Sequence, residues 1–278
     1  MGREKRNAII GQLRDAYDGF TDQGFGSVGL VSYEARFSVL GASTLALEQF
    51  ESVNQELGER FIKFRVRSNE SRAKVLKAIG NVGKEGGMRS EIESSIRQFL
   101  DGLTEEGPPS SVPDWCLDSL SDLSDFTAKA RSHVQRDRKH NLMYLPKPEI
   151  ATRLGKELAK LLLSLADIRG NQEPDEADFQ TVLRVAEDCL PPNRYAVLNH
   201  LRLCHFEGKF ALTADIVKAT KLPESTAKQT LEDLHVLGLV SKQVVSFHGA
   251  VERTRWRLDP EWGDKLYGVW LCSGQIAA

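Results

Sequence analysis

The stretch that decides the fold is residues 211–258, which read ALTADIVKATKLPESTAKQTLEDLHVLGLVSKQVVSFHGAVERTRWRL. Apolar residues first recur at helical spacing, and the pattern then changes to β-rich runs separated by a short turn. Together with the segment before it, the stretch predicts three helices followed by a β-hairpin. The predicted elements are a helix over 194–205, a helix over 211–220, a turn at 221–223, a helix over 224–237, a strand over 240–247, a turn at 248–250 and a strand over 251–258.

This order of elements is that of a winged helix-turn-helix. The run STAKQTLEDL at 225–234, followed by LGLV at 237–240, resembles the recognition helix and the start of the wing in MarR-like winged helices. The resemblance implies contact with duplex DNA, because such helices enter the major groove with their N-terminal half. Glu224, Glu232 and Asp233, on or beside the helix, weaken the case for DNA. The residues expected near phosphates and base edges are Ser225, Thr226, Lys228 and Gln229.

Three arginines alternate along the second strand of the predicted hairpin. Because side chains alternate between the two faces of a strand, Arg253, Arg255 and Arg257 are expected on one face. Such a row would neutralise about three phosphates and make DNA binding strongly dependent on salt. The alternative is a protein-interaction or dimerisation module in which these arginines are solvated or paired with Glu252 and Asp259.

The composition is that of an ordinary globular chain. Of its 278 residues, 41% are hydrophobic and 27% are charged, and the net charge of −2 provides no overall attraction to nucleic acid. The charge is unevenly distributed, since residues 91–125 hold nine acidic residues and one basic residue, whereas residues 126–160 hold nine basic and three acidic residues. We expect two or three domains.

Several classes of site and location are disfavoured by what the sequence lacks. No apolar run approaches the roughly 20 residues that span a bilayer, and the N-terminal residues lack the apolar segment of a signal peptide. The four cysteines are far apart and the six histidines show no ligand spacing, so neither a metal site nor a disulfide framework is expected. We expect a cytoplasmic protein that does not associate with membranes.

The first 67 residues read as a mixed α/β segment that is too short to form a good core alone. Its exposed strand edges would need a partner sheet. The expected elements are a helix over 3–17, a glycine-containing loop over 18–29, short strands over 29–32 and 36–40, a helix over 44–57 and a strand over 61–66.

Parts of this segment resemble the later half of AAA+ and phage-type DNA-dependent ATPases. The matching runs are LRDAYDG at 13–19, RFSVLGAST at 36–44 and LGERFIKFR at 57–65. The resemblance implies that Thr44, or Ser43 beside it, ends a strand next to the γ-phosphate, and that Arg60 reaches the nucleotide of a neighbouring subunit. Arginine suits this role because its planar, permanently charged fork stabilises charge spread over a transferring phosphoryl group. The alternative is a strand-edge Arg60 that pairs with Glu56 or Glu59.

Residues 69–190 read as helical throughout. The runs ARSHVQRD at 130–137 and PEIATRL at 148–154 are similar to the lid of minichromosome-maintenance-type helicases. This resemblance implies that Arg153 approaches the γ-phosphate from the first turn of its helix. The alternative is a plain helical bundle in which Arg153 pairs with Glu149 or Glu157. The expected helices cover 69–80, 87–103, 116–139, 149–168 and 175–188.

One part of such an ATPase is missing from the sequence. No Gly-x-x-x-x-Gly-Lys-Ser/Thr loop precedes these motifs, and each of the three Gly-Lys pairs is followed by Glu or Phe. The chain alone should therefore not hydrolyse ATP, and ATP and magnesium would enter only with a partner chain. We expect either a partner that carries the ATPase core or assembly into a homo-oligomer.

The sequence thus predicts a mainly α fold with a partial α/β ATPase-core remnant over 1–67, a helical lid bundle over 68–190 and a winged helix-turn-helix over 193–278. The first functional hypothesis is a DNA-binding module coupled to the sensor and lid half of a DNA-associated ATPase. The alternative is a stand-alone winged-helix transcriptional regulator with an N-terminal dimerisation or sensing domain. The two differ over the first 67 residues, which a regulator should bury in its own core and an ATPase segment should leave with open apolar surface.

Overall fold

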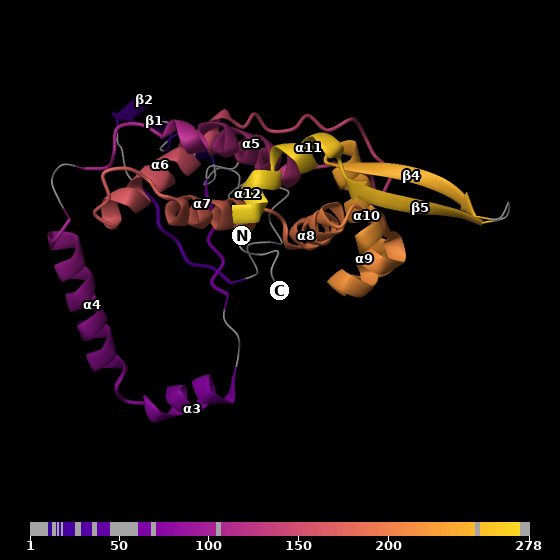
Figure 1. The fold of residues 1–278 in the computed structure, drawn as a ribbon. Helices are drawn as coiled ribbons and strands as arrows, with labels where there is room; N and C mark the ends of the chain where they lie inside the picture. The colour runs from indigo at the N-terminus through magenta and orange to yellow at the C-terminus, as the bar shows by residue number, and fades with distance from the viewer. Residues whose placement is uncertain are drawn as a thin grey trace.

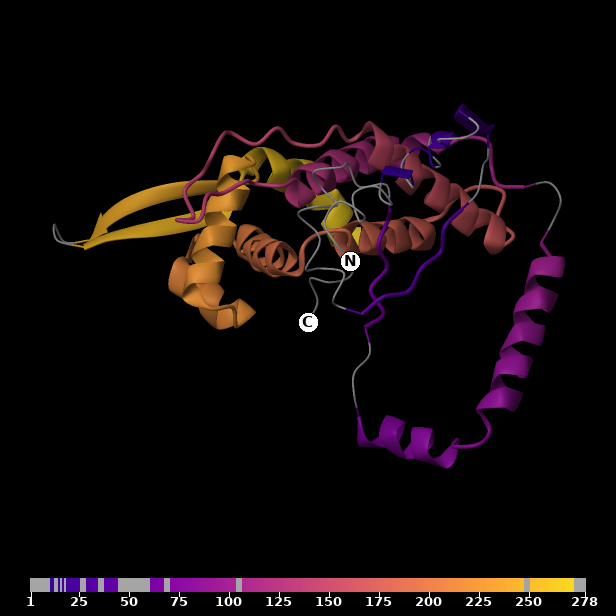
Figure 2. The ribbon, with the colours of Figure 1, turned by 180° about the vertical axis from the view of Figure 1, so that it is seen from behind.

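The computed structural model describes residues 11–12, 15, 17, 19–25, 29–34, 38–44, 61–67, 71–103, 107–247 and 251–272. Over these residues the fold is mainly helical, as the sequence predicts, and its two small sheets are antiparallel. Figures 1 and 2 show an elongated body with a β-hairpin protruding at one end, and an arm of two helices that projects from the body.

The body begins with a group of packed helices, α5 (Asp114–Arg131), α6 (Thr152–Ile168) and α7 (Glu176–Asp188). They associate because each has apolar side chains at helical spacing. In α6, for example, Leu154, Leu158 and Leu162 follow one another every fourth residue, and each is at most 2% exposed. A capping box formed by Asp175 and Asp178 fixes the start of α7.

The other half of the body is formed by residues 192–258. Its elements are α8 (Pro192–Phe206), β3 (Ala211–Leu212), α9 (Thr213–Thr220), α10 (Glu224–Val236), β4 (Val240–Phe247) and β5 (Val251–Leu258). The three strands form an antiparallel sheet in the order β3-β5-β4, with Lys242 opposite Trp256. Lys221, in the turn between α9 and α10, has a left-handed backbone with a φ of 58°. The two long strands have the predicted bounds.

One hydrophobic core connects the two halves of the body. The buried cluster includes Leu158 and Leu183 of the first half and Val197, Leu231 and Trp256 of the second, so it continues across the Pro191-Pro192 pair. After β5 the chain forms α11 (Pro260–Lys265) and α12 (Tyr267–Cys272), which return to pack on α5.

Both of these short helices pack on Phe126 of α5. Its ring centroid lies 5.6 Å from that of Trp262 and 5.8 Å from that of Trp270. Edge-to-face and tilted aromatic pairs of this kind add to the free energy of burial. Trp262 and Trp270 therefore help to hold the two halves of the body together.

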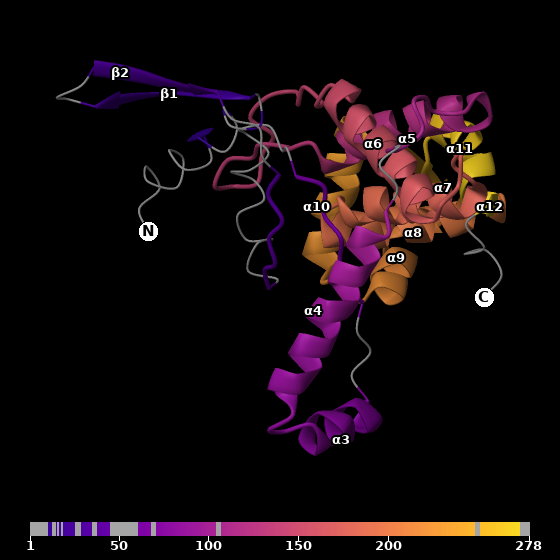
Figure 3. The ribbon, with the colours of Figure 1, turned by 90° about the vertical axis from the view of Figure 1, so that its left-hand side faces the viewer.

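The N-terminal part differs from the sequence-based prediction. Of the predicted helix over 3–17, residues 11, 12, 15 and 17 are described and are helical, while the helix predicted over 44–57 lies almost entirely outside the described residues. The strand predicted over 29–32 is confirmed as part of β2 (Gly29–Glu34), whereas its partner β1 (Phe20–Phe25) lies in the stretch over 18–29 that was predicted as a loop. The hairpin that the two strands form projects from the body in Figure 3. Of the strand predicted over 36–40, residues 38–40 are described, and they form neither helix nor strand.

The strand predicted over 61–66 is also wrong. Residues 61–67 pair with no strand among the described residues and lie against the C-terminal end of α7 instead. The backbone N–H of Arg65 donates to Asp188 Oδ2 at 2.9 Å, and the Arg67 guanidinium donates to Asp188 Oδ1 at 3.1 Å. Alternation alone predicted a strand here, but a strand needs a second strand to satisfy its backbone, and this segment uses a carboxylate.

The helix predicted over 116–139 ends eight residues early, at Arg131. Ser132 already has an extended backbone, and the chain between α5 and α6 runs out beside α10 before it returns to α6 (Figure 1). A reverse turn at Asp137, closed by the Arg136–Leu142 bridge, takes the place of the last two predicted helical turns. We call residues 136–142 the basic loop.

The arm consists of α3 (Arg72–Gly80) and α4 (Glu85–Asp101). Neither helix contains a buried residue, and both stand clear of the body in Figures 1 and 2. Within the residues that the structure describes, no helix combines the length and the apolar character needed to cross a membrane.

Candidate nucleic-acid interface

Helix α10 presents one face to the core and the other to solvent. Ala227, Leu231 and Leu234 are fully buried at 0% exposure, and this spacing anchors the helix to the body. Ser225 and Lys228 are exposed on the opposite face, and Thr226 and Gln229 are half-buried beside them. The four residues that the sequence singled out thus lie together on the N-terminal half of α10.

The hairpin has an inner face toward α10 and an outer face. Trp256 lies on the inner face and is only 1% exposed, and its indole N–H donates to Thr213 Oγ1 at 3.0 Å. Lys242, opposite Trp256 on β4, lies on the same face and pairs with Glu232 of α10 at 2.7 Å. The ion pair joins the hairpin to α10 and offsets one of the negative charges of the helix.

The arginine row lies on the outer face of the hairpin. Because side chains alternate along β5, Arg253, Arg255 and Arg257 point away from the face that Trp256 shares with α10. The guanidinium groups of Arg255 and Arg257 lie over the Phe210 ring, at 4.6 Å and 5.1 Å from its centroid. Arg255 also donates to Gln243 Oε1 at 3.0 Å. The three arginines share a face, as expected, but not the exposed face of α10.

The basic loop borders α10 on a flank that sequence reasoning missed. Arg136 donates to Asp233 Oδ1 through Nε at 2.8 Å and through Nη2 at 2.6 Å. Beyond this anchor, Arg138, Lys139 and His140 are all exposed. The sequence signal was the basic excess over 126–160, which could not be placed while 116–139 was expected to be helical.

Asp137 organises the turn of the basic loop. Its carboxylate accepts from the backbone N–H of Lys139 at 2.7 Å, and from the backbone N–H and side-chain amide of Asn141 at 2.8 Å and 3.0 Å. The hydrogen bonds from Asn141, first of all that of its side chain, and the further bond from Lys139 lower the pKa of the Asp137 carboxyl. His140 takes a left-handed backbone with a φ of 64°, which closes the turn. The hydrogen bonds of Asp137 therefore order the basic loop, and its cationic side chains project from a fixed turn.

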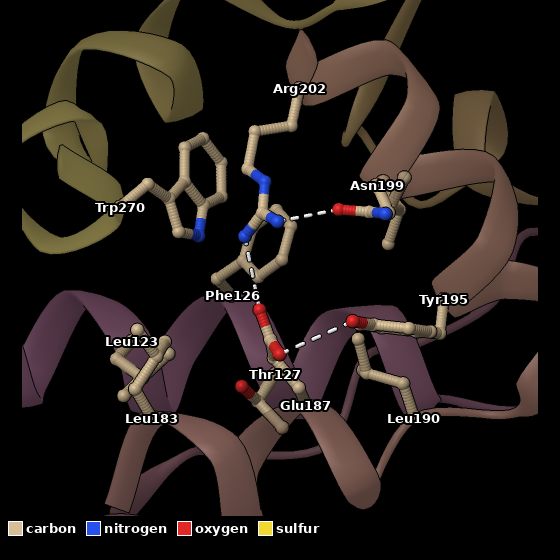
Figure 4. A pocket seen from close by; sticks show the side chains of 11 residues that line it. Leu123, Phe126, Thr127, Leu183, Glu187, Leu190, Tyr195, Asn199, Arg202 and Trp270 are labelled. Atoms are coloured by element: carbon tan, nitrogen blue, oxygen red, sulfur yellow. Dashed lines mark hydrogen bonds and ion pairs between the residues drawn. The ribbon is translucent and has the colours of Figure 1, made fainter. Parts of the chain in front are cut away.

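A buried ion pair joins α7 and α8 inside the body. Figure 4 shows Arg202 of α8 donating to Glu187 of α7, at 3.0 Å, and to Asn199. The same guanidinium lies 5.6 Å from the centroid of the Trp270 ring, and Tyr195 O–H donates to the other Glu187 oxygen at 3.4 Å. Burial, and after it the charge of Glu187, raises the pKa of the Tyr195 phenol. The adjoining cavity of about 30 Å³ has room for water but not for a drug-sized ligand, so we assign this cluster a structural role.

The residues expected from the ATPase resemblance are spread over separate segments. Arg153 is half-buried in the first turn of α6, and Thr44 is exposed at the end of the segment 38–44. Arg60 lies outside the described residues. Across the part of the chain that the structure describes, no group of three or more His, Cys, Asp or Glu side chains is arranged to hold a metal ion.

No protein-family model, curated protein or solved structure matches this chain. The geometry and charge of the residues around α10 are therefore the basis for a function.

Proposed function

We propose that residues 192–258 form a winged helix-turn-helix that binds duplex DNA, with α10 entering the major groove. The order α8, β3, α9, α10, β4, β5 and the sheet order β3-β5-β4 support this proposal. So does the protruding hairpin in Figure 1, which would lie along the DNA backbone beside the inserted helix. This stretch holds ten basic and six acidic residues, a local net charge of +4 in a chain whose total is −2.

The observation that carries the proposal is the pairing of two of the three acidic residues of α10, Glu232 and Asp233. The third, Glu224, is exposed in the first turn of the helix. Glu232 pairs with Lys242 from the hairpin, and Asp233 pairs with Arg136 from the basic loop. Both carboxylates would otherwise repel phosphate, as the sequence suggested. Their pairing leaves Lys228 as the cation on the exposed face of α10, with basic residues on either side.

The contacts divide into those that position the helix and those that read bases. Lys228 and Gln229 have the chemistry for base edges, since lysine donates to guanine and the glutamine amide forms two hydrogen bonds with adenine. Arg138 and Lys139 in the basic loop are suited to phosphates, which fix register without reading sequence. From the hairpin we assign a phosphate contact to Arg253, two residues from the end of β5 nearest the tip, rather than to Arg255 and Arg257, which Phe210 holds on the outer face.

Fluorescence anisotropy with a labelled mixed-sequence duplex, measured over a series of salt concentrations, tests the proposal. The wild-type chain should bind at low salt and lose affinity steeply as salt rises. Arg138→Ala/Lys228→Ala should weaken binding and reduce the slope of log K against log salt by about 1, because Arg138 is assigned to a phosphate and Lys228 to a base edge, and each lost phosphate contact reduces the slope by roughly 1.

The matched control is Lys156→Ala/Lys160→Ala. It removes two exposed lysines of α6, which lies at the end of the body away from the hairpin (Figure 1). This variant should bind as the wild type does. Absence of binding by the wild type at low salt would overturn the proposal, and equal weakening by both variants would move the interface away from α10.

A second candidate function, action with a nucleotide-binding partner, is favoured by one observation. The hydrophobic core contains no residue from the described part of the first 67, where Leu40, Phe64 and Val66 are 101%, 58% and 81% exposed. Open apolar surface is what the ATPase hypothesis expects there. An ATPase assay of the chain alone, with and without duplex, should show no turnover because the phosphate loop is missing. Turnover would contradict that expectation.

A further inference from the structure

The arm carries a continuous apolar stripe in solvent. On α4, Met88, Ile92, Ile96 and Phe99 are 40%, 58%, 52% and 48% exposed. Their spacing of four, four and three residues places them on one side of the helix. Most of the stability of a helix in a protein comes from packing of its apolar face, so the stripe requires a partner surface.

A second stripe lies on α3. Val75, Leu76 and Ile79 are 52%, 56% and 63% exposed, and Val82, just beyond the helix, is 73% exposed. Figure 1 shows α3 and α4 diverging from the short connection between them, and these two fully described helices do not pack face to face. The two stripes therefore cannot cover each other within one chain.

The charges of the two helices indicate what covers them. Residues 71–84, which contain α3, hold four basic residues and no acidic residue. Helix α4 holds four acidic and two basic residues. Each copy of the arm therefore presents one cationic apolar helix, α3, and one anionic apolar helix, α4. The charge of α3 in one copy is complementary to that of α4 in a second copy.

We propose that the arm is a homodimerisation surface, in which α3 of each chain packs on α4 of the other. A two-fold arrangement satisfies both pairings at once, because every α3–α4 contact occurs twice. At 1.5 Å per residue α4 is about 26 Å long and α3 about 14 Å long, so α3 of one chain can lie along α4 of the other over its whole length. Both apolar stripes then leave water.

Sedimentation velocity of the full chain without DNA tests the proposal. The wild type should sediment as a dimer at micromolar concentrations, and Ile92→Glu/Ile96→Glu should sediment as a monomer. Because α4 has no buried residue, this variant should keep the unfolding temperature of the body. A monomeric wild type would overturn the proposal, and so would a variant that remains dimeric.

The matched control is Ser90→Glu/Ser94→Glu. It adds the same two charges at the same spacing, but on the opposite side of α4 from the stripe. This variant should remain a dimer. Dissociation of the control as well would mean that charge on the helix, rather than the stripe, decides the state, and would overturn the proposal.

A charge exchange tests which helices meet. Arg72→Glu/Lys74→Glu/Lys77→Glu in one chain and Glu91→Lys/Glu93→Lys in another should each weaken self-association. Mixed together, the two variants should form a heterodimer, because the α3 and α4 charges become complementary again across one pairing and the other keeps its native charges. Failure of the mixture to associate would exclude the α3–α4 pairing. Neither assay contains DNA, so failure here leaves the DNA-binding proposal standing.

Discussion

Arg136 and Asp233 form an ion pair, at 2.6 Å, that joins the basic loop to helix α10. Their side chains are only 16% and 13% exposed, so the pair is largely shielded from solvent. Arg194 of α8 reaches the second Asp233 oxygen at 3.6 Å. A single carboxylate on α10 thus holds one cation from the loop and one from the body.

The first prediction concerns this pair. Arg136→Met should release the basic loop and lower DNA affinity severalfold, because Arg138 and Lys139 lose their fixed position beside α10. In urea unfolding, the cycle of Arg136→Met, Asp233→Asn and the double variant should give a coupling free energy of about 1.5–3 kcal/mol, the range for hydrogen bonds to charged groups. A coupling near zero would show that the loop is not held by this contact.

The second prediction concerns the buried pair of Arg202 and Glu187, whose side chains are 5% and 7% exposed. Arg202→Met leaves a buried carboxylate without its cation, and should lower the free energy of unfolding by about 3–5 kcal/mol. Arg202→Met/Glu187→Met replaces both charges by apolar groups and should cost less than the single change. Urea denaturation of the two variants checks the order, and a double variant less stable than the single would contradict it.

The hairpin illustrates what periodicity can and cannot predict. Alternation predicted the bounds of β4 and β5 and the shared face of the arginines. It could not say which face, because that depends on Trp256 being buried against the helices. Phe210, which lies under Arg255 and Arg257, comes just before β3 and is 45 and 47 residues away from them in the sequence, so no local pattern could place it there.

The basic loop illustrates the limits of helix prediction. Residues 132–139 contain no proline or glycine, so local pattern favoured continuing α5. The helix ends instead because Arg136 forms an ion pair with Asp233, 97 residues away, and because the Asp137 carboxylate accepts hydrogen bonds from the backbone of a turn. In the same way, 61–67 meets Asp188 rather than a strand. Contacts between residues so far apart in the sequence cannot be predicted from a local pattern of about ten residues.

The third prediction concerns the pH dependence of the basic loop. A depressed carboxyl pKa contributes order that is present above the pKa of the unfolded chain and is lost as the pH falls through the folded pKa. The turn at Asp137 should therefore stay ordered at neutral pH and open in acid. Amide hydrogen exchange at Lys139 and Asn141 should accelerate over that acidic range, and unchanged exchange would contradict the prediction.

A variant identifies the cause of that shift. Asn141→Ala removes the side-chain donor to Asp137 Oδ2 and should raise the Asp137 pKa toward the ordinary aspartate value, as measured by a carboxyl NMR titration. Asn171→Ala, which removes an amide donor to Asp175 instead, should leave the Asp137 pKa unchanged. Equal titration of Asp137 in both variants would exclude the Asn141 side chain as the cause.

The fourth prediction separates the arginines of the hairpin. Arg253 is exposed near the tip, whereas Arg255 and Arg257 stack on Phe210 at the base of the outer face. DNA that lies on the exposed face of α10 would reach the tip of the hairpin but not the base of its outer face. Arg253→Ala should therefore weaken duplex binding and reduce the salt slope by about 1, the effect of one lost phosphate contact. Arg255→Ala/Arg257→Ala should change the affinity by less, although it removes twice the charge. The opposite order, measured by anisotropy at matched salt, would place the DNA on the outer face of the sheet and α10 away from the groove.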